Sequence, residues 1–476
     1  MHKRTCLAIL ILGLGCNFSQ AAEAERNSTI KDQKQVAVTI YNQDLALVKD
    51  SRAVALESGE NVLAWRDVSA RIRPETALLR STTTQIQLIE QNFDFDLLTP
   101  NKLLEKHVGR KLRVIKTNPA SGAETSEEAT VLSANEGVVL QFADRIESHP
   151  AGRLAFQTLP ENLRDRPTLV IDLHAADAGN QNLELSYLTS GLSWKADYVA
   201  ELSAKDDRLD LNGWVTLTNQ AGTTFRNAKL QLVAGDVNRA QEEVPEFAYK
   251  NRGAMPTVNA APQMKEESLF EYHLYSLDRP TTLANNQTKQ MALLSATQVP
   301  VKKEFQLRGA DYYYRNSQAE IGRKLKVGVF VEFENKGHNL GIPLPKGTIR
   351  VYKRDASGNA QFVGEDRVDH TPKNETVRLK LGDAFDITAD KKQTDFQKVG
   401  GTGRYNYIYD AAFQIDLKNA KNEAIIVKIQ EPIPGDWEVL EENHAHSKAA
   451  ANLAVWNIPV PAEGKTTLTY RVRVKY

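Results

Sequence analysis

The chain has 476 residues, of which 41% are hydrophobic, 7% aromatic and 25% charged, as is typical of a folded protein rather than a disordered one or one that crosses a membrane many times. The 60 basic residues balance the 60 acidic ones, which argues against a nucleic-acid-binding protein, because such a protein needs a positively charged face. The length corresponds to about three domains of ordinary size.

The first 21 residues have the features of a secretory signal peptide. A positive start at Lys3 and Arg4 precedes a short apolar stretch over residues 7–15, and small residues lead to a cleavage site after Ala21. The apolar stretch is too short for a transmembrane helix, and no later segment approaches 18 apolar residues. We therefore expect a periplasmic or secreted protein with no transmembrane segment in the mature chain.

Both cysteines of the chain, Cys6 and Cys16, lie within this segment. Cleavage after Ala21 would leave a mature chain without disulfides or thiol chemistry. The alternative makes Cys16, which follows Gly15, a lipidated N-terminus that anchors the protein to a membrane.

Alternation of apolar and polar residues with a period of two dominates the sequence beyond a polar leader at 22–34. The longest examples are residues 405–417, 321–333 and 468–476. This pattern is typical of antiparallel strands with one buried face. Shorter strands are predicted at 36–40, 183–187, 230–233, 348–352, 377–381 and 425–429.

One helix is predicted over residues 101–108. Thr99 can cap its N-terminus, Pro100 suits the first helical position, and Gly109 can end it. Strands are expected after it at 112–115, 130–132 and 138–142.

These elements predict a mainly β fold of antiparallel β-sandwich domains with a small α+β insertion and a long irregular linker. Beyond the signal peptide at 1–21, the expected parts are an N-terminal β module at 35–95, a helix plus small β unit at 96–160, a continuation of the β domain at 165–240, a Pro-rich linker or excursion at 241–310, and a C-terminal β-sandwich at 311–476.

Two glycine-containing segments resemble phosphate-binding loops. A long predicted strand follows Gly400–Gly403, whereas a phosphate loop needs a helix there, so a hairpin loop is expected. Pro459 stands where the first glycine of a P-loop ending in Gly464-Lys465-Thr466 should be, so this segment is interpreted as a turn.

The sequence contains few candidate catalytic groups. His444 and His446 form the only close histidine pair, and an exposed loop explains them better than a metal site. Ser28 and Lys31 match Ser-x-x-Lys only within the polar leader, and acidic pairs such as Asp94 with Asp96 are common in a chain with 60 acids. No catalytic, cofactor-binding or metal-ligating residue is predicted.

Aromatic residues could form a carbohydrate-stacking platform. The run Tyr312-Tyr313-Tyr314 would expose at least one ring if it were a strand. The tyrosines at 405, 407 and 409 continue into an apolar stripe and are interpreted as part of a core face. Four tryptophans are expected to anchor the core: Trp194, Trp214, Trp437 and Trp456.

Three stretches together resemble the bacterial secreted proteins grouped as domain of unknown function 4139, some of which are labelled mucoidy inhibitor A-like. The first runs from Gly191-Leu192-Ser193-Trp194 and Tyr198 to Leu232, the second from Tyr272-His273-Leu274-Tyr275 to Lys289, and the third from Leu344-Pro345-Lys346-Gly347 to Ile387. The resemblance covers residues 36–476. It implies an exported, β-rich protein and supplies no catalytic residue.

The favoured function is that of an exported, non-enzymatic cell-envelope protein that acts by binding or as a structural module. Its partner would be an envelope protein or a glycan, not nucleic acid, and its oligomeric state is not predicted. The alternative is an envelope hydrolase acting on glycan or peptide. That alternative requires His370 with Asp366 and Asp369, or the histidine pair at 444 and 446, to converge in one cleft.

Overall fold

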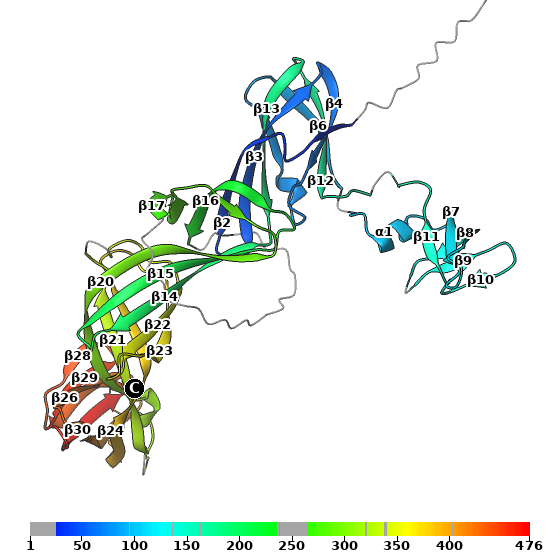
Figure 1. Ribbon diagram of the computed structural model, residues 1–476. Helices are drawn as coiled ribbons and strands as arrows, with labels where there is room; N and C mark the ends of the chain where they lie inside the picture. Colours follow the sequence, from blue (N-terminus) through cyan, green and yellow to red (C-terminus); the bar gives the residue numbers. More distant parts are fainter. Residues whose placement is uncertain are drawn as a thin grey trace, which may run out of the picture. The chain divides into compact units, whose positions relative to one another are not determined.

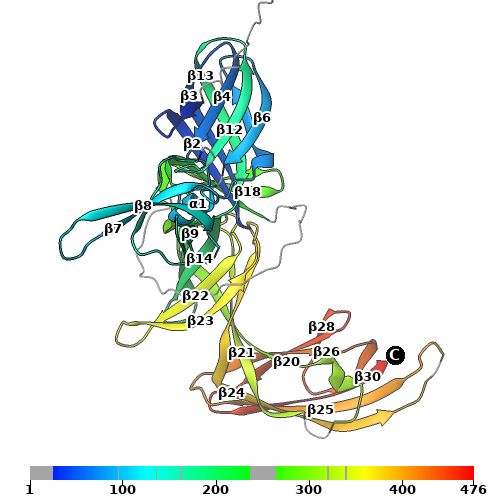
Figure 2. The same ribbon diagram turned by 90° about the vertical axis from the view of Figure 1, so that its right-hand side faces the viewer.

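The computed structural model describes residues 25–94, 96–135, 137–160, 163–235, 238, 264–318, 321–337, 340–401 and 403–476 (Figures 1 and 2). These residues form almost entirely β structure, with one short α-helix and both mixed and antiparallel sheets, which confirms the predicted mainly β fold. The predicted signal peptide at 1–21 lies outside the described residues, as do residues 241–263 of the predicted linker.

The chain divides into two compact units. The first comprises the residues up to Val36 together with Leu47–Thr189 and Ala221–Thr223, and the second comprises Ala37–Ala46, Ser190–Gln220 and Thr224–Tyr476.

The first unit contains a four-stranded sheet of order β1-β4-β12-β6 and the neighbouring strands β3, β13 and β5. Alternate side chains of β4 and β12 are fully buried, among them Leu63, Trp65 and Ile171. The bounds are β1 (Arg26–Ser28), β3 (Leu45–Leu56), β4 (Gly59–Arg66), β5 (Leu78–Ser81), β6 (Ile86–Asp94), β12 (Thr168–Ala175) and β13 (Gly179–Thr189), with a 3₁₀ turn η1 at Pro74–Thr76.

The first unit also contains a five-stranded sheet of order β10-β9-β8-β7-β11, which follows the helix in the chain. Helix α1 (Pro100–Glu105) begins as predicted, with the Thr99 hydroxyl accepting from the Lys102 amide at 3.2 Å, but it ends three residues before the predicted end at 108. The amide of Lys106 closes its last turn. The strands are β7 (Lys111–Thr117), β8 (Glu124–Ser133), β9 (Val139–Gln141), β10 (Ile146–Glu147) and β11 (Arg153–Ala155).

In the second unit, β17, β18, β16 and β2 lie in that order, and β19 pairs with β16. Strand β2 joins β16 in parallel, with Val38 opposite Leu230. The bounds are β2 (Gln33–Tyr41), β16 (Phe225–Ala234), β17 (Met264–Leu269), β18 (Tyr272–Leu277) and β19 (Thr281–Leu283).

A long sheet of order β23-β22-β14-β15-β20-β21-β24-β25-β30-β27 makes up the rest of the second unit, and its strands run side by side as extended ribbons in Figure 1. Strand β26 pairs with β20, β29 pairs with β26, and β28 pairs with β29. The bounds are β14 (Leu192–Leu202), β15 (Arg208–Asn219), β20 (Gln287–Arg308), β21 (Gly322–Glu334), β22 (Gly347–Arg354), β23 (Ala360–Val368), β24 (Thr376–Lys398), β25 (Ile408–Asn419), β26 (Ile425–Pro432), β27 (Asp436–Glu442), β28 (Ser447–Ala450), β29 (Leu453–Val460) and β30 (Lys465–Lys475), with a 3₁₀ turn η2 at Asp311–Tyr314.

The first seven strands of this long sheet form a roll that brings β23 against β24. The Asp366 carboxylate of β23 accepts a hydrogen bond from the Lys380 amide of β24 at 2.7 Å. A Cβ atom on Gly364 would lie 2.4 Å from the Leu381 carbonyl oxygen, so only glycine fits there. We call β23, β22, β14, β15, β20, β21 and the first half of β24 the rolled sheet.

The remaining strands pack as two layers around a core that includes Phe413, Trp456 and Tyr470. The alternation predicted from residue 405 is present in β25, where Ala411, Phe413, Ile415 and Leu417 are all buried. The strand begins at Ile408, however, so Tyr405 and Tyr407 precede it.

The arrangement of the strands differs from the sequence expectation as well. Residues 264–308, expected within an irregular linker, form four strands, of which β20 is 22 residues long. Strands β22 and β23, expected in the C-terminal sandwich, pair with β14 instead. Among the strand pairs whose register the described residues show, β1–β4, β2–β16, β14–β22 and β20–β26 are parallel, which a hairpin connection cannot produce.

Candidate functional site

Asp366 and His370 of the predicted hydrolase site contact different groups in the structure. Asp366 accepts from the amides of Arg367 and Lys380. His370 lies after β23, where its Nδ1 accepts from the Lys346 amide at 3.2 Å and its Nε2 lies 3.5 Å from the Asn42 side-chain nitrogen. The structure therefore places His370 as a support of the loop at Lys346.

The histidine pair lies in the turn between β27 and β28. His446 Nδ1 lies 3.0 Å from the Glu442 carboxylate, and its ring lies 5.7 Å from the rings of both Trp437 and Trp456. Burial alone would raise the pKa of Glu442, but hydrogen bonds from His446 and Trp456 outweigh it and lower that pKa. In the part of the chain that the structure describes, no group of three His, Cys, Asp or Glu side chains has the arrangement of a metal site.

The other sequence candidates lie in structural settings. Ser28 is buried in β1, and its carbonyl accepts from Arg52 at 2.9 Å. Asp94 pairs with Arg164 at 2.8 Å, whereas Asp96 pairs with Lys106 at 3.1 Å.

Both glycine-containing segments connect consecutive strands, and neither leads into a helix. Residues 400–403 lie between the antiparallel strands β24 and β25, which confirms the predicted hairpin, although residue 402 itself is outside the description. Lys465 begins β30 directly after Gly464.

The tyrosine run at 312–314 is a 3₁₀ turn rather than a strand. Tyr314 is fully buried against Phe413, with ring centroids 5.0 Å apart, while Tyr312 is 55% exposed. Three of the four predicted tryptophan anchors, Trp194, Trp437 and Trp456, are buried.

The structure brings together the three sequence stretches that carry the family resemblance. From the first stretch, the Tyr198 hydroxyl donates to the Pro345 carbonyl at 2.8 Å. From the second, the Tyr275 hydroxyl donates to the Pro343 carbonyl at 2.7 Å. Burial raises the pKa of both tyrosines, so both hydroxyls stay protonated and able to donate. Two buried tyrosines thus hold the loop that opens the third stretch.

A buried asparagine makes the same loop rigid. The Asn335 side chain, fully buried, donates to the carbonyls of Ile342 at 2.8 Å and Pro372 at 2.9 Å, and accepts from the Gly341 amide at 3.0 Å. Leu344 and Thr371 exchange two backbone hydrogen bonds of 2.8 and 2.9 Å. The loops at 341–346 and 370–372 therefore form one cross-linked wall.

A cavity of about 220 Å³ lies against this wall. Its apolar lining includes Tyr275, Leu344 and three prolines, and its polar lining includes His273, His370 and Glu271. We call it the proline pocket. A concave site with an apolar body and a few fixed polar groups is the usual form of a binding site in a folded protein.

The β17–β18 hairpin supplies the open side of the proline pocket. His273 Nδ1 lies 2.8 Å from the Glu266 carboxylate of the paired strand. At the two-residue tip of the hairpin, Phe270 is 84% exposed and has a φ of +56°, a conformation that strains a bulky side chain. An exposed aromatic ring in a strained turn beside a pocket is a common feature of binding loops.

Sequence reasoning placed no function on His273 or Phe270. Tyr272-His273-Leu274-Tyr275 carries part of the family resemblance, and only the fold shows that it meets the loop at 343–346, some 70 residues further along the chain. In the sequence, this contact is indicated by the three distant stretches that together carry the family resemblance.

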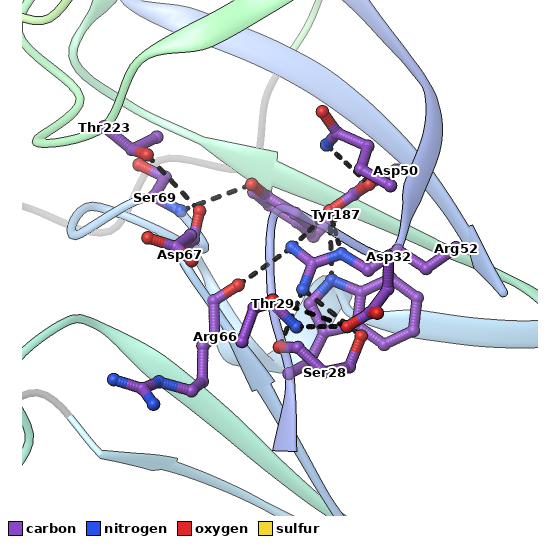
Figure 3. Close-up of polar contacts among 12 residues, drawn as sticks. Ser28, Thr29, Asp32, Asp50, Arg52, Arg66, Asp67, Ser69, Tyr187 and Thr223 are labelled. Atoms are coloured by element: carbon purple, nitrogen blue, oxygen red, sulfur yellow. Dashed lines mark hydrogen bonds and ion pairs between the residues drawn. The ribbon is translucent and has the colours of Figure 1, made fainter. Parts of the chain in front are cut away.

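A second cluster of polar side chains, in the first unit, has a structural role (Figure 3). The guanidinium of buried Arg52 donates to Asp50 at 2.7 Å and to the carbonyls of Ser28 at 2.9 Å and Arg66 at 2.8 Å, and it lies 4.5 Å from the Trp65 ring centroid. All three nitrogens of the guanidinium are thus bonded to protein atoms, and they tie β1, β3 and β4 together.

These features define a strand-dominated protein that presents a preformed pocket from its second unit. The chain belongs to the family described as Domain of unknown function (DUF4139), whose model matches residues 183–476, more than half of the chain. The match begins at residue 183 rather than at residue 36. No curated protein matches the chain significantly. No helix among the described residues is long and apolar enough to cross a membrane.

Proposed function

We propose that this protein is exported to the cell envelope and acts there by binding an envelope protein or glycan, without catalysis. The observation that carries this proposal is the proline pocket, where three stretches within the family match meet and where the exposed, strained Phe270 precedes the lining residue Glu271. The rigid wall favours recognition because little conformational entropy is lost when a ligand binds to it.

The groups of the pocket support binding more than chemistry. A hydrolase needs a base oriented toward a nucleophile or water. Here both ring nitrogens of His370 contact other groups of the protein, the Lys346 amide and the Asn42 side chain. The Nε2 edge of His273 and the Glu271 carboxylate suit hydrogen bonding to a bound glycan or peptide.

Export is tested by fractionation and mass spectrometry of the mature N-terminus. We expect a periplasmic or secreted chain that starts at Ala22. A chain that starts at a lipidated Cys16 would show that the exported protein is anchored to a membrane. A cytosolic chain that retains Met1 would contradict the proposal.

Binding is tested with the full mature chain, isolated peptidoglycan and solubilised envelope proteins. We expect wild type to retain one of them, and Phe270→Gly and His273→Ala to weaken that retention at least about tenfold. Phe385→Ser is the matched control, because Phe385 is also in the second unit and is 96% exposed, but unlike Phe270, which precedes the lining residue Glu271, it is not next to a residue of the pocket. Equal retention by all four proteins, or release of cleaved glycan or peptide, would contradict the proposal.

A further inference from the structure

The rolled sheet of the second unit contains a second cavity, unrelated to the proline pocket. It has a volume of about 270 Å³ and receives side chains from β14, β20, β21, β22, β23 and β24. Its floor is apolar and includes Leu202, Val329, Val331 and Leu381. Cavities at the end of a rolled β-sheet are frequent sites for small apolar ligands.

Two lysines break the apolar pattern of this interior. Lys353 follows Ile349 and Val351 along the buried face of β22, and it lies opposite Leu202 of the parallel neighbour β14. Lys303 of β20 lies opposite Val331 of β21. Both lysines therefore stand on a face where strand alternation calls for apolar side chains, although each is about 30% exposed.

Both lysine ammonium groups meet one carboxylate. Asp206, in the β14–β15 turn, accepts from Lys303 at 2.7 Å and from Lys353 at 2.5 Å. Burial alone would raise the pKa of Asp206, but the two lysines outweigh it and lower that pKa, so the carboxylate stays charged. Asp206 has a φ of +58°, a left-handed turn conformation that aspartate adopts more readily than most residues.

The lining of the cavity itself carries two lysines and two carboxylates, and two further lysines outside the lining give its surroundings an excess of positive charge. Two lysines share Asp206, and the lining residue Asp383 is likewise within 4.0 Å of two lysines, Lys326 and Lys380. Positive groups above an apolar floor complement a molecule with an anionic head and an apolar tail.

We propose that the cavity of the rolled sheet binds a single-chain anionic amphiphile, with the head group at Lys303 and Lys353 and the alkyl chain on the floor of Leu202, Val329 and Val331. The volume of about 270 Å³ suits one chain, not a large cofactor. The proposal does not depend on the function of the proline pocket.

The test uses the full mature chain and dodecanoate at submicellar concentration, measured by isothermal titration calorimetry. We expect saturable binding of dodecanoate, and at least about tenfold weaker binding of both dodecanol and acetate, which lack the charge and the chain respectively. Equal binding of dodecanoate and dodecanol, or no saturable binding of dodecanoate, would overturn the proposal.

Two variants with opposite expected effects make the test specific. Lys303→Gln/Lys353→Gln removes the cationic head site, and dodecanoate should bind about tenfold more weakly. Asp206→Asn removes the internal competitor for both lysines, and dodecanoate should bind several-fold more tightly, while asparagine tolerates the positive φ. A role of these residues in folding alone would give no gain of affinity in Asp206→Asn.

Lys418→Gln is the matched control, because Lys418 is also paired with one carboxylate, Asp390 at 2.6 Å, but lies outside the cavity. Its affinity for dodecanoate should equal that of wild type. An unchanged affinity in both cavity variants, or an equal loss in Lys418→Gln, would refute the assignment.

Discussion

At the scale of single residues, the second unit contains an ion pair that is buried in its core. Lys391 and Glu431 are 2.6 Å apart, with side-chain exposures of 2% and 0%. The Tyr314 hydroxyl also donates to Glu431, at 2.9 Å. A Cβ atom on Gly309 would clash with the Glu431 carboxylate. Burial lowers the pKa of Lys391, although the attraction of Glu431 opposes that change.

Removal of the lysine should leave an uncompensated buried charge. We expect Lys391→Met to lower the free energy of unfolding by about 3–5 kcal/mol. Lys391→Met/Glu431→Gln should recover most of that loss, because the second change removes the charge and keeps an acceptor for Tyr314. Urea denaturation of the three proteins measures both effects.

The exposed pair of Lys418 and Asp390 provides the comparison. Lys418 is 44% exposed, so Lys418→Met should cost less than about 1 kcal/mol. If the double variant at Lys391 and Glu431 were no more stable than Lys391→Met, the unpaired charge would not be the cause of the loss.

A second prediction concerns the strained Phe270. Glycine adopts a φ of +56° without steric strain, so Phe270→Gly should raise the free energy of unfolding by up to about 1 kcal/mol even though it removes a large side chain. The ring is 84% exposed and contributes little buried area. Phe270→Ala keeps the strain and removes the ring, so it should not stabilise the protein. Thermal denaturation followed by circular dichroism distinguishes the two variants.

At the scale of elements, the closure of the rolled sheet depends on Gly364. Its φ is +155°, and an added Cβ would lie 2.4 Å from the Leu381 carbonyl oxygen, which is main-chain and cannot rotate away. Gly364→Ala should therefore push β23 from β24 and lower the free energy of unfolding by about 1–3 kcal/mol.

Gly358→Ala separates this clash from backbone strain. Gly358 has a φ of +84° and nothing within 4 Å of an added Cβ, so its variant carries strain alone. Gly364→Ala should also weaken dodecanoate binding, since Val363 and Leu381 line the cavity, whereas Gly358→Ala should not. Equal effects of the two substitutions would show that contact between β23 and β24 is not required.

The same elements show how much of the fold was predictable. Strands β21, β25 and β30 each have one face toward solvent and one face toward the core, so the alternation of polar and apolar residues predicts them. Strand β20 was missed because two register shifts against β15 move its side chains between faces, and four consecutive residues, 291–294, are buried.

The sites were less predictable than the strands. His273 and His370 are 97 residues apart in the chain, and Lys303 and Lys353 are 50 apart, so no local spacing could reveal either cavity. The sequence does place a lysine on the apolar face of β22, after Ile349 and Val351. This break in the alternation singles out Lys353 but does not indicate which residue it contacts.

At the scale of the whole molecule, individual carboxylates respond to acid in opposite directions. In the second unit, the pKa values of Asp390 and Asp410 are lowered, chiefly by hydrogen bonds from Lys418 and Arg473. In the first unit, burial and the nearby charges of Glu90 and Glu60 raise the pKa of Asp172.

The sign of each effect on stability follows from proton linkage. A carboxylate whose pKa is lower in the folded state adds stability that is complete above its unfolded pKa, near 4, and is lost as the pH falls through the folded pKa. Asp172 has the reverse sign, because its folded state favours the protonated form and gains relative stability as the pH falls.

We expect the urea midpoint of wild type to be nearly constant between about pH 7 and 5 and to fall below about pH 4, since Asp206, Glu304 and Glu442 also have lowered pKa values. Asp410→Asn should lower the midpoint at pH 7 and reduce the acid-induced fall, because the pair of Asp410 with Arg473 is already lost. Asp172→Asn should raise the midpoint at pH 7 and enlarge the fall. Because these two variants change the pH profile in opposite directions, identical profiles for both would exclude proton linkage as the origin of the acid response.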